Sequence, residues 1–412
     1  MKELLNNKSF VFLMLAQMIS GLGDWLSLVA IMTLVGLKWN ASPMEVSFIM
    51  LCLVVPMALL GPMAGALSDR LSRKVIMITS DFIRSALILL LAGAESIEEV
   101  YLYLFLIGLF SALFIPAKNG MLKELVVKEH VKGASSFTSM IDAGTKIIGP
   151  VLSGILVSTF GTNPVFFIDA ATFFVSALLL LFLPKSVQTS ASHKKSHPSS
   201  FQNDFAEGLT FIFSKSHLLT GLFFLGCSLF ILQLSDSQII VLIRELTLTS
   251  PNLFGYIVTA SGLGMFLAGF VLTKKTNYNA FALMLIGVFI IGFSFGGMAL
   301  LTYFDVHGSL IWAPLMGLFA GCAASLILIP FQASVQLETP VHMTGRVFGL
   351  INSVTTTATI FGPLLGGWLA TVFGAVPTFI MTASFLLFLA VLGFLMKNKI
   401  ERSQSIVSKS QQ

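Results

Sequence analysis

The chain has 412 residues, of which 56% are hydrophobic and only 10% are charged. Soluble domains carry about 25% charged residues, so this composition excludes a soluble globular protein. It predicts a polytopic membrane protein instead.

The first predicted element is a retained membrane helix. The short polar N-terminus, 1–9, is followed by an apolar run with no small-residue cleavage site after it, which argues against a signal peptide. Crossing a hydrocarbon core of roughly 30 Å takes about 20 apolar residues. Twelve runs approach or exceed this length and predict an all-α protein with transmembrane helices at 9–37, 42–67, 75–93, 100–117, 134–159, 165–183, 217–243, 253–273, 280–303, 309–332, 346–371 and 377–396.

One long polar segment, 184–216, separates the sixth and seventh runs. Its first part is rich in Ser, His and Lys, which is typical of a flexible linker. Its second part has apolar residues at helical spacing and predicts an amphipathic helix on the inner membrane face. We therefore expect a six-helix bundle at 1–183, a linker at 184–216, a second six-helix bundle at 217–396 and a tail at 397–412.

The basic residues predict the orientation. If the N-terminus is inside, 20 of the 24 lysines and arginines fall in inner segments. The outer loops hold only Lys38 and Arg244, while Arg84 and Lys146 lie within helices. Because inner loops of membrane proteins are enriched in Lys and Arg, this distribution places both termini and the linker in the cytoplasm.

The two halves repeat. Gly149-Pro150 with Gly154 matches Gly362-Pro363 with Gly367 at a constant offset of 213 residues. An offset of six helices preserves the orientation in the membrane, so the pattern predicts two parallel six-helix repeats. The alternative is chance similarity between apolar helices, which does not account for matched Gly-Pro positions with matched flanking loops.

The loop between the second and third runs carries a specific motif: Gly65, Asp69, Arg70, Arg73 and Lys74. So short and charged a loop marks a membrane surface. The motif resembles the loop 2–3 signature of the major facilitator superfamily, with Ser72 in place of the second glycine. The other reading is a positively charged anchor loop of any membrane protein.

This resemblance implies a gate and a transport class. It implies that Asp69 approaches the start of the eleventh helix, near Arg346, when the bundles close on the inner side. Gly23-Asp24-Trp25 and the Asp81 to Arg84 stretch resemble the drug-efflux branch, which includes macrolide-efflux proteins and the enterobactin exporter. Gly149, Pro150 and Gly154 resemble the helix 5 signature of antiporters. Many drug antiporters carry an arginine in helix 4, which the run 100–117 lacks, and Arg84 in helix 3 is a candidate replacement.

Charged residues inside a bilayer are expensive and are therefore candidates for function. Asp24 has no oppositely charged neighbour in its own helix, Asp81 and Arg84 are spaced i,i+3, and Asp142 and Lys146 are spaced i,i+4. We interpret Asp24, Asp142 and Asp81 as proton-coupling candidates. The alternatives are a satisfied core residue at Asp24 and ion pairs that only neutralise each other. Asp81 lies near the inner surface, and Asp169 and Asp236 lie near the outer surface, where we expect water to reach them.

The C-terminal half offers small polar side chains instead of charge pairs. Candidates for a substrate-facing wall are Gln233, Asp236, Gln238, Asn352 and Thr356. The alternative is that they are hydrogen-bonding contacts between helices.

The residues together favour a secondary transporter. Beyond the first turn of each predicted helix, five acidic residues but only two basic ones are embedded, which favours protons and cationic or neutral amphipathic substrates over anions. We predict proton-coupled export by alternating access; the alternative is uptake or export of a single endogenous metabolite or lipid. An enzyme is disfavoured, because the histidines fall in or beside loops and no phosphate-binding loop or metal spacing is present. We expect no cofactor, no metal and no nucleic acid, and a monomer in the cell membrane with a small molecule, a proton and the bilayer as partners.

Overall fold

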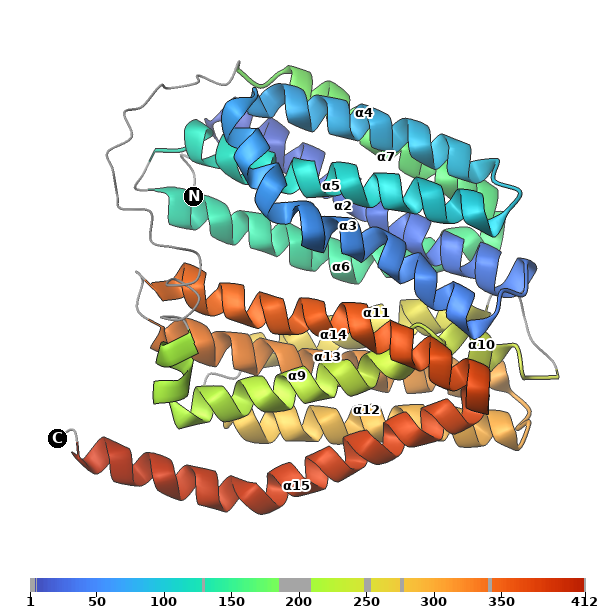
Figure 1. Cartoon of the computed structure of the whole chain (residues 1–412), viewed down its shortest axis with the longest axis vertical. Coiled ribbons are helices and arrows are strands. Elements are labelled where there is room, and N and C mark those ends of the chain that lie inside the picture. The colour runs from blue at the N-terminus through green and yellow to red at the C-terminus, as the bar shows by residue number, and fades with distance from the viewer. Residues whose placement is uncertain are drawn as a thin grey trace. The chain divides into compact units, whose positions relative to one another are not determined.

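A computed structural model describes residues 4, 6–127, 130–184, 209–247, 253–274, 278–339 and 343–410 (Figure 1). This part of the chain is helical and contains no strand. It forms two compact units. The first consists of Met1–Ala191 and Ser250–Gly262, and the second of Ser192–Thr249 and Leu263–Gln412.

Each unit is a bundle of long helices. The helices up to the linker are α2 (Lys8–Thr33) with a π-helical extension (Leu34–Lys38), α3 (Pro43–Arg70), α4 (Arg73–Ala92), α5 (Ile97–Leu125), α6 (Val131–Phe160) and α7 (Thr162–Leu181). The later helices are α9 (Ser216–Asp236), α10 (Ile239–Ile243), α11 (Leu253–Lys274), α12 (Ala280–Tyr303), α13 (Ser309–Glu338), α14 (Thr344–Phe373) and α15 (Ala375–Ser410).

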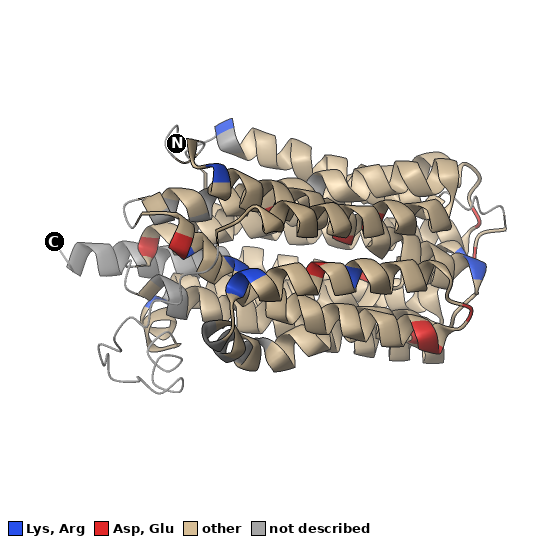
Figure 2. Cartoon of the chain, turned by 90° about the horizontal axis from the view of Figure 1, so that it is seen from above, with Lys and Arg blue, Asp and Glu red and all other residues tan. Residues whose placement is uncertain are grey.

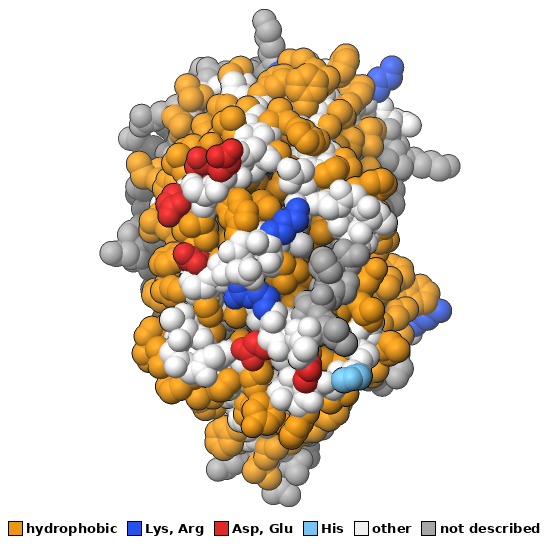
Figure 3. All heavy atoms as spheres, turned by 90° about the vertical axis from the view of Figure 1, so that its right-hand side faces the viewer, with side chains coloured by type: hydrophobic (Ala, Val, Ile, Leu, Met, Phe, Trp, Pro, Cys, Tyr) orange, Lys and Arg blue, Asp and Glu red, His pale blue; other side chains and the backbone are white. Residues whose placement is uncertain are grey.

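The helices confirm eleven of the twelve predicted membrane spans. Within the described residues, eleven helices are long and apolar enough to cross a membrane. The remaining predicted span, 134–159, lies within α6. In the described residues its apolar part, Ile148–Phe160, is shorter than a full membrane span. Charged residues are sparse along the helices (Figure 2), and the face seen in Figure 3 carries scattered acidic and basic side chains among apolar ones. The predicted amphipathic helix starts outside the described residues; residues 209–214 are helical.

Local sequence signals set the helix ends. Ser42 caps α3 in a capping box with Glu45, and Pro43 occupies the first turn, where its missing N–H costs nothing. Gly161 and Gly374, which are 213 residues apart, have φ of 82° and 92°. Both break the chain between two consecutive helices, and this left-handed backbone favours glycine. The same turn chemistry therefore separates α6 from α7 and α14 from α15.

The same helix pairs pack in both halves. In the first half, α2 packs on α6 and α7, and α4 packs on α5 and α7. In the second half, the corresponding pairs are α9 with α14 and α15, and α12 with α13 and α15. Two equivalent glycines permit close contacts: a side chain at Gly149 would overlap Trp25, and one at Gly362 would overlap Gln233. The packing therefore follows the sequence repeat.

Candidate functional site

A cavity of about 810 Å³ opens within the first unit. Residues from α2 through α7 line it, and its walls are largely apolar, with Trp25 among them. Six charged side chains line the same space: Asp24, Arg84, Lys118, Lys123, Asp142 and Asp169. The cavity has the size and mixed lining of a small-molecule site.

Two carboxylates face this open space. Asp24 on α2 and Asp142 on α6 are both exposed. Asp142 Oδ1 accepts a hydrogen bond from Gln17 Nε2 at 2.6 Å, so α2 and α6 are joined through the cavity wall. Asp24 accepts no hydrogen bond from the residues that the structure describes. One of the two acids is therefore held by a neighbouring amide, and the other is open to water or to a ligand.

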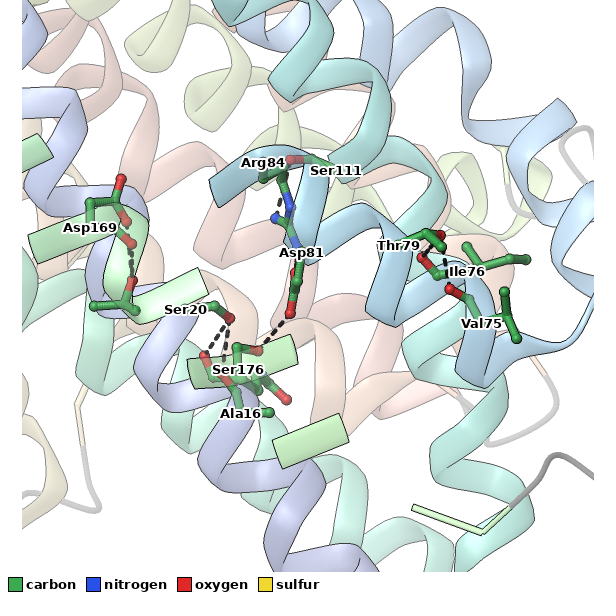
Figure 4. A network of polar contacts seen from close by, with 12 residues as sticks. Ala16, Ser20, Val75, Ile76, Thr79, Asp81, Arg84, Ser111, Asp169 and Ser176 are labelled. Carbon is green, nitrogen blue, oxygen red and sulfur yellow. Dashed lines mark hydrogen bonds and ion pairs between the residues drawn. The ribbon is translucent and has the colours of Figure 1, made fainter. Parts of the chain in front are cut away.

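Asp81 and Arg84 form the predicted ion pair on α4 (Figure 4). The Asp81 side chain is 0% exposed and that of Arg84 is 4% exposed, so the expectation that water reaches Asp81 is wrong. Ser176 Oγ on α7 donates to Asp81 Oδ2 at 2.6 Å. The carboxylate is sealed because α7 covers it, and Ser176 is 95 residues further along the chain.

Arg84 is fixed on several sides. Its Nη1 donates to Ser111 Oγ on α5 at 3.3 Å. Its guanidinium carbon lies 4.6 Å from the ring centre of Phe114 and 4.4 Å from that of Phe173. Such cation–π contacts strengthen when they are shielded from water. Arg84 therefore joins α4, α5 and α7, and its charge is matched by Asp81 rather than by Asp24.

Asp169 on α7 is buried, and the expectation that water reaches it is also wrong. Ser27 on α2 donates to its carboxylate, and Thr172 Oγ1 donates to Oδ1 at 3.1 Å. A side chain at Gly23 would overlap both Asp169 and Thr172. Gly23 thus provides the space on α2 that admits this carboxylate, and it is the sequence signal that could have indicated the contact.

Lys118 was missed as a site residue, because the predicted fourth span ends at residue 117. The structure extends α5 to Leu125 and places Lys118 on the cavity wall. Met121 and Leu122, which follow it, are buried at 0% and 6% exposure. Their helical spacing from Lys118 is the signal that the helix continues.

The gating motif is described only in part. Arg73 Nη1 lies 2.6 Å from Glu124 Oε1 in an ion pair, and Lys74 Nζ donates to the carbonyl oxygen of Leu181 at 2.7 Å. These contacts attach the start of α4 to the ends of α5 and α7. The side chains of the other motif residues and of one predicted charge partner lie outside the described residues: Gly65, Asp69, Arg70, Arg346 and Lys146. The gate and the Asp142–Lys146 pair remain predictions.

The Gly-Pro motif lies at close helix contacts. A side chain at Gly154 would overlap Thr259 and the backbone of Gly255, both of which belong to the first unit. Thr259 Oγ1 donates to the Val151 carbonyl oxygen at 3.4 Å. Pro150, Pro363 and Gly367 are buried within α6 and α14.

The wall candidates of the second unit have mixed surroundings. Asp236 and Asn352 are exposed, and Thr356 is half-buried. Gln238 is 0% exposed and its Nε2 donates to Ser237 Oγ at 3.2 Å. Gln233 packs against Gly362. The two glutamines thus lie at internal contacts, and the wall itself remains a prediction.

No group of three or more His, Cys, Asp or Glu in the described residues is placed to hold a metal ion. The three cysteines are free thiols.

Comparison with known proteins gives the family. The family model for the major facilitator superfamily matches residues 13–358 and 250–411. The uncharacterized MFS-type transporter YfiS of Bacillus subtilis (strain 168) is 36% identical over 406 residues, 98% of this chain and 97% of the relative. Multidrug resistance protein MdtG of Proteus mirabilis (strain HI4320) is 25% identical over 338 residues, 80% of each chain.

Solved structures agree on the fold. A crystal structure of the nucleoside transporter NupG has a TM-score of 0.72 at 14% identity and covers 94% of this chain and 99% of that one. A bacterial homolog of the human lysosomal transporter Spinster has a TM-score of 0.71 at 15% identity and covers 96% and 97%. At these identities the likeness shows the fold alone. With the family match and the relative that spans nearly the whole chain, it follows that this protein belongs to the major facilitator superfamily and is a multi-pass membrane transporter.

Proposed function

We propose that this transporter exports small amphipathic compounds, cationic or neutral, in exchange for protons. The observation that carries the proposal is the cavity of about 810 Å³ in which Asp24 and Asp142 face open space between apolar walls. The printed name of the MdtG relatives, multidrug resistance proteins, supports the same class of cargo.

The cavity lining favours an amphipathic cargo. Its apolar side chains can hold a hydrophobic body, and the two exposed acids can hold an amine or a hydrogen-bond donor. A ligand pocket needs few polar groups to orient a molecule whose remaining surface is apolar. An anion would meet Asp24 and Asp142 directly, which disfavours anionic cargo.

Exchange requires that proton and cargo compete. Asp24 and Asp142 can bind either a proton or a cationic group, and a protonated carboxyl no longer attracts a cation. If protons enter from the outer side, they expel cargo there, and loss of the proton to the cytoplasm restores the site. Asp81 is already matched by Arg84 within the protein, so we assign it a supporting role.

The test is transport by the full chain in proteoliposomes, with ethidium as the cationic cargo and an imposed pH gradient. We expect Asp24→Asn and Asp142→Asn each to abolish uphill transport. At least one should still exchange ethidium without a gradient, because an amide resembles a protonated carboxyl. Glu98→Gln, which removes an exposed carboxylate at the start of α5 outside the cavity, is the matched control and should transport normally.

Normal uphill transport by both asparagine variants would contradict proton coupling at this site. A wild-type protein that transports none of a panel of amphipathic compounds would contradict the cargo class and would favour a single endogenous metabolite or lipid.

A further inference from the structure

Unlike Arg84, Lys118 has no fixed partner among the residues that the structure describes. Its side chain is half-buried and lines the cavity. It forms no hydrogen bond and no ion pair with any residue in the described part of the chain. Arg84, in contrast, is held by Asp81, Ser111 and two aromatic rings. No described residue therefore holds the Lys118 ammonium in place.

Lys118 lines the same cavity as Asp24, Asp142 and Arg84. An ammonium group is attracted by the two carboxylates and repelled by the guanidinium group. Gln17 occupies one oxygen of Asp142, and no described residue donates to Asp24. A lysine carries three rotatable donors on a flexible four-carbon stem, so it can move between the two acids.

The other charged residues at the cavity cannot replace Lys118 as a movable partner of Asp24 and Asp142. Asp169 is buried behind the hydroxyl groups of Ser27 and Thr172, and Asp81 is matched by Arg84. Lys123, which follows Lys118 further along α5, borders the cavity but is exposed. The cavity thus holds two accessible acids and one internal ammonium that can approach either of them.

We propose that Lys118 is a tethered cation that can swing to the amine position beside Asp24 and Asp142 when no cargo is bound, and that a cationic cargo displaces it. The inference rests on the proposed function, because it assigns cargo to this same cavity. It also narrows the cargo class to compounds with one positive charge on an apolar body. When such a compound binds, its positive charge replaces that of Lys118, so the net charge beside the two acids does not change.

This exchange sets a limit on affinity. A cationic cargo must release Lys118 before it binds, whereas a neutral cargo that uses the apolar walls does not. Removing the ammonium should therefore strengthen the binding of cations and leave the binding of neutral compounds unchanged. Tighter binding without the returning lysine should also slow release, so transport of the cation should show a lower KM together with a lower kcat.

The first experiment measures equilibrium binding to the full chain in lipid nanodiscs. The probes are tetraphenylphosphonium, which carries one positive charge, and triphenylphosphine oxide, which is neutral and of similar shape. We expect Lys118→Met to bind the cation roughly three- to tenfold more tightly than wild type, with unchanged binding of the oxide. Lys118→Arg, which keeps the charge, should resemble wild type. Lys215→Met removes a lysine outside the cavity and controls for net charge.

The second experiment needs no cargo. Thermal unfolding of Lys118→Met, of the double variant Asp24→Asn/Asp142→Asn, and of the triple variant forms a mutant cycle. If Lys118 pairs with these acids in the empty protein, Lys118→Met should lower the melting temperature of wild type but not that of the double variant.

Equal or weaker cation binding by Lys118→Met, or additive melting shifts in the cycle, would overturn the tethered cation. One outcome would separate the two proposals. In it, the melting-temperature shifts of the mutant cycle are non-additive, but neither the wild type nor any variant binds either probe. That result would support the pairing of Lys118 with the acids and would count against export of amphipathic compounds.

Discussion

The interiors of the two units differ in the polar side chains that they hold. In the first unit, helices carry the Asp81–Arg84 pair, the buried Asp169 and the charged cavity of Asp24, Asp142 and Lys118. In the described spans of the second unit, the polar contacts come mainly from hydroxyl groups. Ser235 and Thr382 are 2.7 Å apart between α9 and α15, and Ser325 donates to the Met265 carbonyl oxygen at 3.0 Å.

This difference separates what the repeat preserves from what it varies. Both halves keep the same helix pairs, the same glycine breaks and the same close contact between the first and fifth helices. These features depend on backbone shape and small residues. In the described residues, the buried ion pair and the charged cavity lie in the first unit, whereas the second unit carries the carboxylate of Asp236 at the end of α9. We infer that the first unit supplies most of the ion chemistry and the second a frame of mostly neutral polar contacts. Four predictions test this comparison, in order of decreasing expected effect.

Arg84→Met should have the largest effect, because it leaves the Asp81 carboxylate buried without its cation. Breaking a buried ion pair costs about 3–5 kcal/mol of stability. The measurement is the free energy of unfolding in detergent micelles by denaturant titration.

The control for Arg84→Met lies in the second unit. Ser235→Ala removes one hydroxyl of the Ser235–Thr382 contact and should cost about 1 kcal/mol, as a neutral hydrogen bond does. Equal losses for the two variants would show that the charged interior is no more critical to stability than the neutral one.

Gly149→Ala tests a feature that the halves share. A Cβ atom here would lie 2.5 Å from Trp25 Cβ, so we expect a loss of about 1–3 kcal/mol from overpacking. Gly362→Ala should behave alike, since its Cβ would overlap Gln233. A Cβ atom added at Gly144, on the same helix as Gly149, would meet no atom within 4 Å, and Gly144→Ala should stabilise α6 by about 0.5–1 kcal/mol. A stabilising Gly149→Ala would refute the close contact.

Gln17→Leu tests the contact between α2 and α6 in the first unit. It removes the donor to Asp142 at 2.6 Å, and we expect a loss of about 1 kcal/mol because water can partly replace the amide at an exposed carboxylate. A double-mutant cycle with Asp142→Leu isolates the hydrogen bond from lost packing. Additive unfolding energies in the cycle would show that the hydrogen bond does not contribute.

The sequence predicted most of the fold because its signals are local. Apolar run length marks each span, and Gly149-Pro150 with Gly362-Pro363 marks the repeat. The Asp81–Arg84 pair was predictable for the same reason, since both residues share one helix. The burial of Asp169 was not, because it depends on Ser27, 142 residues away, and on the space left by Gly23. Lys118 was missed because the apolar run ends before the helix does.

The smallest expected effect is at Asp305, in the loop between α12 and α13 of the second unit. Thr247 Oγ1 donates to Asp305 Oδ2 at 2.5 Å and the Thr247 N–H donates to Oδ1 at 3.2 Å, and these hydrogen bonds hold the pKa of Asp305 below its usual value. A carboxyl group whose pKa is lower in the folded state than in the unfolded state binds fewer protons when the protein is folded. Its contribution to stability is therefore present above the unfolded pKa, about 3.9, and is lost as the pH falls through the folded pKa.

Thr247→Val removes the hydroxyl donor and should lower the melting temperature slightly at pH 7. The difference from wild type should shrink as the pH approaches about 3, because a protonated carboxyl gains less from this donor. In an Asp305→Asn background, which has no carboxyl group here, the effect of Thr247→Val should not change with pH. The nearby His307 also carries a titratable charge, but it is present in every variant compared, so its contribution cancels in the comparison. A difference that grows at low pH would contradict the assignment. A difference that does not change with pH would show that this loop contact, like the hydroxyl contacts inside the second unit, does not depend on a charged carboxylate.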